Sequence, residues 1–301
     1  YGPVVSLALQ DLNDLPPQLI LDGACGTSLI AQGLDVSVEP TAIWNLSHPE
    51  EVRAMHQSFI DAGAGAVQTN TFAANRISLR EAGFEEEVRK CNDAGVEIAQ
   101  AAASDSAYVI GSIGPSGKIP PPQGDANLME LEETFAEQAH HLAQAGVHFL
   151  HVETMAHPKE LRAALRGVRM TTKLPVVVSM ACRRTQEGFT TTMGFSVESM
   201  LAVALEEKAD GIGANCLLSP IAMVPLIELM VAAAKVPIFA KPTIAPDGGA
   251  PLYPQEFAEG LAALFAAGAR AAGGCCGTNA KDIECAVQHM ARHELQSVQP
   301  S

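Results

Sequence analysis

The chain has 301 residues, of which 48% are hydrophobic, and its 34 acidic and 19 basic residues give a net charge of −15. A surface this acidic repels nucleic acid, and the sequence contains no basic stripe with interleaved aromatic residues, so we expect no nucleic-acid partner. No apolar run reaches the length of a transmembrane helix, so we expect no membrane partner either. An odd number of cysteines, seven, and the lack of a signal-peptide pattern favour a reducing, cytoplasmic location over a disulfide framework.

Short apolar runs alternate with helical patterns along the chain. Strands are expected at residues 19–22, 66–70, 107–113, 149–154, 176–181, 211–216, 238–242 and 269–274. Apolar residues recur about every 3.6 positions between them, for example at residues 49–62, 128–145, 158–171 and 197–207. Eight strand–helix units in a chain of this length predict a (β/α)8 TIM barrel. No linker or break in composition interrupts the pattern, so residues 1–301 are expected to form one domain.

A doubly wound open sheet is the alternative arrangement of alternating strands and helices. Its first strand would more naturally be followed by a Gly-x-Gly-x-x-Gly turn. Here that turn reads Asp22-Gly23-Ala24-Cys25-Gly26-Thr27 and does not match the pattern. The sequence therefore favours the barrel.

Polar side chains end several of the expected strands. Asp22, Asn70 and Glu153 close the first, second and fourth strands. The carboxyl ends of barrel strands converge on one mouth, where active sites are built. These three residues are therefore candidate site residues, although each carboxylate could instead cap the helix that follows it.

Three cysteines also lie at strand ends. Cys216 ends the sixth strand, and the adjacent pair Cys275 and Cys276 follows the eighth within a glycine-rich turn. Neighbouring cysteines bond each other only through a strained ring, but both can reach one metal ion where the backbone turns sharply. Three thiolates with one position left open are typical of a catalytic zinc site. We therefore expect a zinc site at the C-terminal face of the strands, against the alternative that the pair only fills a tight turn.

The remaining cysteines and several histidines show no such arrangement. Cys25, Cys91, Cys182 and Cys285 match no ligand position and are expected to be ordinary small buried residues. No His-Glu-x-x-His pattern involves His140, His141, His148 or His151, which we interpret as structural or surface residues.

These motifs, in this order, resemble those of the homocysteine S-methyltransferases, which include the homocysteine-binding barrel of cobalamin-dependent methionine synthase and the betaine– and S-methylmethionine–homocysteine methyltransferases. The resemblance runs from about residue 19 to residue 280. It rests on Leu21-Asp22-Gly23-Ala24 with Gly26-Thr27, Gln68-Thr69-Asn70-Thr71-Phe72 with Asn75-Arg76, Gly114-Pro115-Ser116-Gly117, Glu153-Thr154, Gly213-Ala214-Asn215-Cys216 and Gly273-Gly274-Cys275-Cys276-Gly277-Thr278. Each motif alone is weak, whereas the pairing of one cysteine with a later cysteine pair is specific.

The resemblance implies a cytoplasmic enzyme that methylates the thiol of homocysteine to give methionine. It implies that Cys216, Cys275 and Cys276 hold Zn²⁺. The carboxylates of Asp22 and Glu153 would hold the homocysteine ammonium, and the amides of Gly23 and Ala24 would receive its carboxylate. Asn70 is expected in the same substrate pocket.

The methyl donor is the least defined part of this hypothesis. Ala73 stands where betaine-dependent relatives carry an aromatic residue, and residues 71–76 resemble the cobalamin-dependent branch more closely. After the seventh strand, Thr243 replaces the asparagine usual in that branch. We expect a methyl-corrinoid donor, such as methylcobalamin, carried by a separate corrinoid protein or module, with S-methylmethionine or betaine as alternatives.

Other functions remain open from the residues alone. The acceptor could be a different thiol, or the chain could be a zinc-binding partner without catalytic activity. A metal-free barrel lyase would need a Schiff-base lysine, for which Lys241 at the end of the seventh strand is the candidate.

Overall fold

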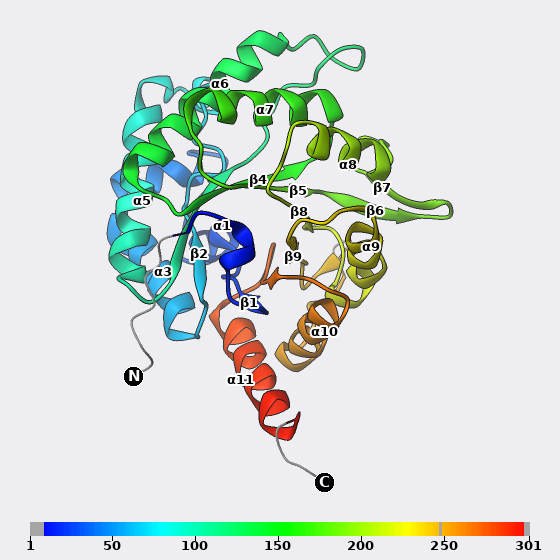
Figure 1. Ribbon diagram of the computed structural model, residues 1–301. Coiled ribbons are helices and arrows are strands. Elements are labelled where there is room, and N and C mark those ends of the chain that lie inside the picture. The colour runs from blue at the N-terminus through cyan, green and yellow to red at the C-terminus, as the bar shows by residue number, and fades with distance from the viewer. Residues whose placement is uncertain (1–8, 247–248, 298–301) are drawn as a thin grey trace.

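Eight parallel strands form one sheet that curves into a barrel, with helices around it (Figure 1). The computed structural model describes residues 9–246 and 249–297. The barrel strands are β1 (Leu19–Ile20), β2 (Ala66–Gln68), β3 (Tyr108–Ile113), β4 (Phe149–Met155), β5 (Val176–Met180), β8 (Gly211–Asn215), β9 (Ile238–Lys241) and β10 (Ala271–Ala272). Each coincides with one of the eight expected strands, so the predicted (β/α)8 barrel is confirmed.

The strands follow one another around the barrel in the order β1-β10-β9-β8-β5-β4-β3-β2. A parallel bridge between Leu21 and Ala66 joins the two ends of this order and closes the barrel. Several strands are shorter than expected, most clearly β10, because residues 273 and 274 already leave the sheet for the loop at its carboxyl end. The Gly273 amide still bonds the Ala240 carbonyl of β9, whereas the Gly274 amide bonds the carbonyl of Asp22, beyond the end of β1.

The helices lie between the strands in chain order and cover the outside of the barrel (Figure 1). Among the described residues they are η1 (Leu12–Asp14), α1 (Cys25–Ala31), η2 (Thr41–Ile43), α2 (Trp44–Ser47), α3 (Pro49–Asp61), α4 (Arg76–Glu81), η3 (Glu85–Glu87), α5 (Val88–Ala103), α6 (Leu128–Ala145), α7 (Pro158–Thr171), α8 (Val197–Glu206), α9 (Pro220–Ala233), α10 (Pro254–Ala266) and α11 (Ala280–Ser297). No helix in the described part of the chain is both long enough and apolar enough to cross a membrane.

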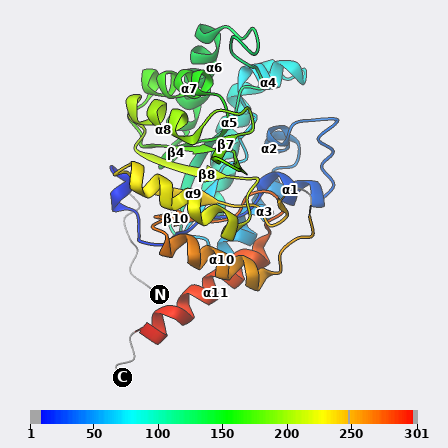
Figure 2. The same cartoon turned by 90° about the vertical axis from the view of Figure 1, so that its right-hand side faces the viewer.

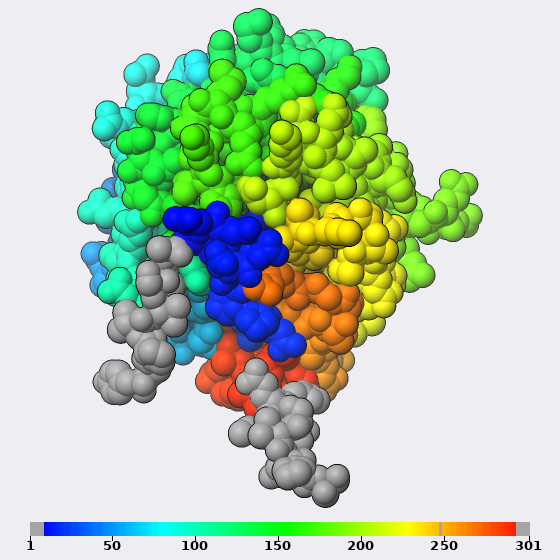
Figure 3. Space-filling model, in the orientation of Figure 1, coloured from blue at the N-terminus to red at the C-terminus, as the bar shows by residue number. Residues whose placement is uncertain are grey.

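The barrel interior is filled with apolar side chains, as expected for strands buried on both faces. Residues such as Phe149, Val177 and Phe239 form an inner core. Leu12 of η1 and Leu15, which follows η1, belong to the same core and close its amino-terminal end. In the space-filling view the early, blue segment lies across the centre of this face (Figure 3). The open end of the barrel is therefore the opposite one, where α1 and α2 lie (Figure 2).

One element was not expected from the sequence. The strands β6 (Cys182–Thr185) and β7 (Gly188–Thr191) pair antiparallel and form a hairpin that projects from the barrel (Figure 1). It is inserted between β5 and α8, and most of its side chains are exposed or half-buried. Because few of its residues alternate between apolar and polar, the periodicity of the sequence does not reveal it.

Candidate active site

Three cysteine sulfurs meet at the carboxyl ends of β8 and β10. The Sγ of Cys216 lies 3.1 Å from that of Cys275 and 3.2 Å from that of Cys276, and Cys275 and Cys276 are 4.0 Å apart. Cys216 adopts a left-handed backbone conformation, with φ of 64°. This conformation is uncommon outside glycine, and here it turns the chain at the strand end toward the cysteine pair. The structure thus brings together the three residues predicted as ligands.

Backbone hydrogen bonds to the end of β9 fix the two segments that carry the cysteines. The Cys275 amide donates to the Pro242 carbonyl at 2.8 Å, and the Cys216 amide to the Lys241 carbonyl at 2.9 Å. A Cβ on Gly274 would lie only 2.2 Å from the side chain of Thr278. Glycine is therefore required there, because any side chain would push the cysteine pair away from Cys216.

The geometry and chemistry of this group fit a zinc ion. Sulfurs bound tetrahedrally at about 2.3 Å from zinc lie about 3.8 Å apart, so the 4.0 Å separation of Cys275 and Cys276 already matches and Cys216 needs to move away from both by only a fraction of an ångström. Hydrogen bonds from Cys216 and Cys275 lower the pKa of Cys276 to about 3, whereas hydrogen bonding raises the pKa of Cys275 well above its usual value. One thiolate is thus stabilised by two thiols, and ionising all three requires a cation between them.

A pocket of about 450 Å³ lies beside the sulfurs at the open end of the barrel. Its lining combines residues from the carboxyl ends of β2, β3, β4 and β9 with residues from the segments that follow β1, β2, β8 and β10, as predicted for a barrel mouth. The lining residues are Gly23, Ala24, Cys25, Gly26, Thr27, Ile30, Val36, Thr41, Gln68, Thr69, Asn70, Phe72, Ser112, Glu153, Thr154, Cys216, Lys241, Gly274, Cys275 and Cys276.

Glu153 presents a buried carboxylate to this pocket. Its Oε1 accepts hydrogen bonds of 2.6 Å from both Gln68 Nε2 and Ser112 Oγ. Burial raises the pKa of Glu153 above its usual value, against the lowering effect of the nearby Lys241 charge. A carboxylate held rigidly at the end of a pocket suits a positively charged group of a ligand.

Asp22 lies behind the pocket wall, fully buried, rather than lining it. Lys241 Nζ lies 2.7 Å from Asp22 Oδ1, and the backbone amide of Gln68 donates to Asp22 Oδ2 at 2.7 Å. Burial alone would lower the pKa of Lys241, but the carboxylates of Asp22 and Glu153 outweigh it and raise that pKa. Asp22 is thus paired with a charge of the protein itself.

The other predicted substrate residues have distinct positions. Gly23 lines the pocket, and a Cβ there would lie 2.7 Å from the Phe59 ring. The Ala24 amide already donates to the Thr278 carbonyl at 3.0 Å, so it is not available to a carboxylate as expected. Asn70 lines the pocket with its side-chain amide bonded to the Thr41 carbonyl and to Asn45 Oδ1. It therefore supports the segment that contains η2 and α2.

Three further residues join the site without having been singled out as site residues from the sequence. Gln68 bridges Glu153 and Lys241, since its Nε2 donates to Glu153 and its Oε1 accepts from Lys241. Ser112 holds Glu153, and Asn215 donates to Thr154 Oγ1 and to the Cys275 sulfur. Gln68 and Asn215 lie at the carboxyl ends of strands, which is the signal that could have identified them.

A second group with metal-binding side chains consists of Asp22, Cys25 and His56, whose ligand atoms lie within 4.8 Å of one another. Asp22 is neutralised by Lys241, and burial raises the pKa of the Cys25 thiol above its usual range. A buried cation beside Lys241 would be repelled, so this group does not fit a metal ion.

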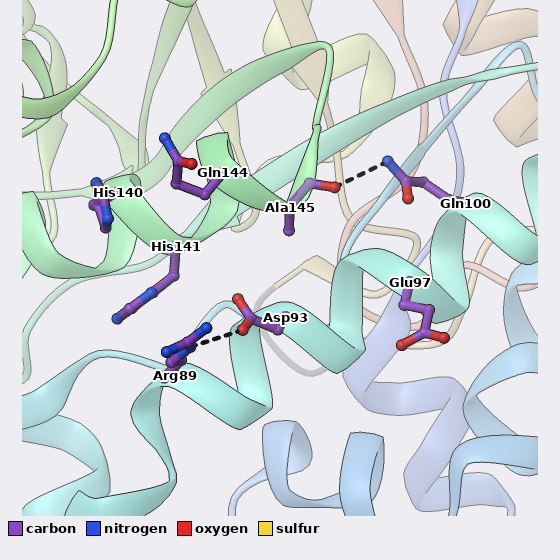
Figure 4. Close-up of a pocket in the computed structure, with 8 residues that line it drawn as sticks. All are labelled: Arg89, Asp93, Glu97, Gln100, His140, His141, Gln144 and Ala145. Atoms are coloured by element: carbon purple, nitrogen blue, oxygen red, sulfur yellow. Dashed lines mark hydrogen bonds and ion pairs between the residues drawn. The ribbon is translucent and has the colours of Figure 1, made fainter.

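The outer surface carries another hollow, of about 550 Å³, between α5 and α6 (Figure 4). It is lined by charged and polar side chains, among them Arg89, which pairs with Asp93, and His141. It lies outside the barrel and contains none of the residues at the strand ends. The pocket beside the cysteines is therefore the candidate active site, although this hollow is larger.

Comparison with known proteins identifies the family of the chain. The family model described as Homocysteine S-methyltransferase matches residues 19–290. The chain is 30% identical to methionine synthase of Mycobacterium tuberculosis (strain ATCC 25618 / H37Rv), over 97% of this chain and 26% of that protein. It is 29% identical to methionine synthase of Mycobacterium leprae (strain TN), over 91% of this chain and 24% of that protein. The chain thus spans about a quarter of the length of these relatives.

Solved structures with the same fold include the homocysteine methyltransferase MmuM from Escherichia coli. Its metallated form superposes with a TM-score of 0.76 at 22% identity, over 91% of this chain and 97% of that one. Its oxidised form gives a TM-score of 0.77 at 21% identity, over 93% and 99% of the two chains. At 21–22% sequence identity, this similarity shows a shared fold and nothing about function.

Proposed function

The chain belongs to the homocysteine S-methyltransferase family, and from that premise we propose that it transfers a methyl group from a methyl-corrinoid to the thiol of homocysteine, giving methionine. The observation that carries this proposal is the ring of three cysteine sulfurs beside a pocket that ends in a buried carboxylate. A thiol acceptor with an ammonium group can place its sulfur at the ring and its charge at Glu153.

The three cysteines would hold Zn²⁺ and leave one position open toward the pocket. Zinc bound there would keep the acceptor sulfur deprotonated at neutral pH, where a free thiol with a pKa near 8.5 is mostly protonated. Asn215 donates a 3.9 Å N–H···S hydrogen bond to Cys275 and would stabilise the negative charge that this sulfur carries as a zinc ligand. No general-base histidine is needed, because no proton remains on the acceptor sulfur when it attacks.

Glu153 would orient the acceptor in this pocket. Its Oε1 is fixed by Gln68 and Ser112, which leaves its second oxygen to accept a hydrogen bond from the substrate ammonium. A charged hydrogen bond in such a buried position contributes about 1.5–3 kcal/mol. The ammonium would thus be bound at one end of the pocket and the sulfur at the other.

The rim of the pocket supports a large donor over betaine. Phe72 is the one aromatic residue among the described residues that line the pocket, whereas a quaternary ammonium requires several aromatic faces. Trp44, the first residue of α2, is buried, and its indole N–H donates to Glu39. Ile30, Val36 and Phe72 are exposed at the mouth and offer an apolar rim to a flat macrocycle.

The Schiff-base alternative is not supported. A lysine that attacks a carbonyl must lose its proton, which requires a lowered pKa. Lys241 is instead paired with Asp22, and its pKa is raised. Borohydride trapping with carbonyl compounds is expected to leave Lys241 unmodified.

The decisive experiment compares methyl donors in parallel on the zinc-loaded protein. Methyl transfer to homocysteine is measured with methylcobalamin, a methylated corrinoid protein, S-methylmethionine and betaine. We expect turnover with the corrinoid donors and little with betaine. Robust turnover on betaine without any response to a corrinoid would overturn the choice of donor, and no transfer from any donor despite tight zinc binding would favour a non-catalytic zinc protein.

A further inference from the structure

Lys241 brings a positive charge into the inner end of the pocket. It extends from the end of β9, is only 3% exposed, and lies among the residues that line the pocket. Its Nζ lies 2.7 Å from Asp22 Oδ1, and it also donates to Gln68 Oε1. An ammonium group of the protein is therefore already bound to one of the two carboxylates at this end of the barrel.

Both oxygens of Asp22 already accept a hydrogen bond from the protein, and its full burial separates them from a ligand. Oδ1 accepts a hydrogen bond from Lys241 Nζ, and Oδ2 accepts one of 2.7 Å from the backbone amide of Gln68. The residue is fully buried. Glu153 differs, because both of its protein hydrogen bonds go to Oε1. Among the described residues, no group bonds its Oε2.

The charges at this end of the pocket sum to −1, since Asp22 and Glu153 are acidic and Lys241 is basic. A single ammonium placed at Glu153 would neutralise the group. The same ammonium would also be repelled by Lys241, because the Gln68 side chain links the two residues and keeps them near each other. The pocket therefore attracts an ammonium less strongly than two free carboxylates would.

We propose that Lys241 is a specificity-determining residue: it occupies Asp22 as an internal ammonium, so that Glu153 alone recognises the ammonium of the acceptor. This inference rests on the proposed function, in which the acceptor is homocysteine. Asp22 then acts by holding Lys241 in place and not by contacting the substrate.

The test compares homocysteine with 4-sulfanylbutanoate, which has the same thiol and carboxylate but no amine. The amine preference is the ratio of their kcat/KM values with methylcobalamin, and also the ratio of their dissociation constants measured by calorimetry on the zinc-loaded protein. Lys241→Met removes the internal cation and its repulsion of the substrate ammonium, so the amine preference should rise by about tenfold or more. Asp22→Asn leaves the Lys241 charge without its carboxylate, so the preference should fall, but clearly less than in Glu153→Gln, which removes the carboxylate that contacts the ammonium and should lower it by about ten- to a hundredfold.

Two outcomes would overturn the inference. One is an amine preference that falls in Asp22→Asn as far as it does in Glu153→Gln. The other is a preference that stays unchanged or falls in Lys241→Met. If Lys241→Met does not fold, Lys241→Gln, which can still donate to Asp22, is expected to raise the preference by about threefold or more.

The two proposals can fail separately. Methylation of neither thiol by any donor would contradict the proposed function, and the calorimetric ratios would still decide the role of Lys241. Methylation of both thiols with the wrong pattern of preferences would leave the methyltransferase function in place and remove the role assigned to Lys241. Failure of both thiols to bind the zinc-loaded protein would overturn both.

Discussion

Asn215 and Thr154 are joined by two reciprocal hydrogen bonds. The Thr154 amide donates to Asn215 Oδ1 at 2.8 Å, and Asn215 Nδ2 donates to Thr154 Oγ1 at 2.7 Å. Thr154 has a φ of 63°, which a β-branched residue rarely adopts. The pair therefore connects the end of β8, which carries Cys216, to the end of β4, which carries Glu153, and holds Thr154 in its strained conformation.

Replacing Asn215 should loosen both parts of the site. In Asn215→Ala the Thr154 amide and hydroxyl lose their partners, so the free energy of unfolding should fall by about 1–3 kcal/mol. Urea unfolding monitored by circular dichroism measures this change. Gln186→Ala, at an exposed position of the β6–β7 hairpin, is the control and should stay within about 0.5 kcal/mol of the wild type. Equal stability of the two variants would show that the hydrogen-bonded pair does not support the site.

The purified protein should bind about one zinc ion per chain through sulfur, at a distance of about 2.3 Å. Elemental analysis gives the metal content, and X-ray absorption at the zinc edge gives the neighbours. Three sulfurs at mutual distances of 3.1 to 4.0 Å are the reason for this expectation. A spectrum dominated by nitrogen or oxygen neighbours would contradict it.

Each of the variants Cys216→Ala, Cys275→Ala and Cys276→Ala should abolish methyl transfer and weaken zinc binding. Two thiolates supply too few protein ligands for the site, and the metal content of each dialysed variant reports the loss. Cys91→Ala is the control, because Cys91 is buried between α5 and its neighbours, away from the pocket. Loss of all activity in Cys91→Ala alone would mean that the ligands have been assigned wrongly.

Glu153→Gln should weaken homocysteine binding without releasing zinc. Loss of one charged hydrogen bond corresponds to about 1.5–3 kcal/mol, which is roughly ten- to a hundredfold in the KM for homocysteine. Zinc content should remain near the wild-type value, since Glu153 is not a predicted ligand. Simple thiols without an amine should lose much less. Equal losses for both kinds of thiol would indicate that Glu153 has a structural role instead.

His56 should make the protein less stable in weak acid. Its two ring nitrogens have no partner among the described residues, and burial lowers its pKa to about 4. In the unfolded chain this pKa is about 6.5, so between these values the unfolded state binds the proton and the folded state does not. Stability therefore falls as the pH drops from about 6.5 to 4, by about 3 kcal/mol from this residue.

The variant His56→Leu isolates this contribution. Guanidinium unfolding of wild type and variant at several pH values gives the two pH dependences. The wild type should lose more stability than the variant between neutral pH and pH of about 4, by the amount that His56 contributes. Parallel curves for the two proteins would contradict the buried, neutral state of His56.

The barrel could be predicted from the sequence because each strand is a short apolar run and each helix has its own apolar spacing. Strand β5 (Val176–Met180) is an example: all of its residues are buried, so consecutive positions are apolar or small and the strand is visible as a continuous run in the sequence. The β6–β7 hairpin escaped prediction for the opposite reason, since its half-exposed residues carry no regular pattern.

The positions of Cys216, Cys275 and Cys276 at strand ends, and of Glu153 at another, were likewise decided by the sequence, because parallel strands of a barrel all point their carboxyl ends to one face. The sequence did not determine which charged groups pair with each other. Asp22 and Lys241 are separated by 219 positions, and nothing in their local sequence indicates that they form a 2.7 Å ion pair. Only the closure of the barrel, which sets β1 beside β10 and β10 beside β9, brings them together, and the exclusion of water from that interior is what obliges the two charges to pair.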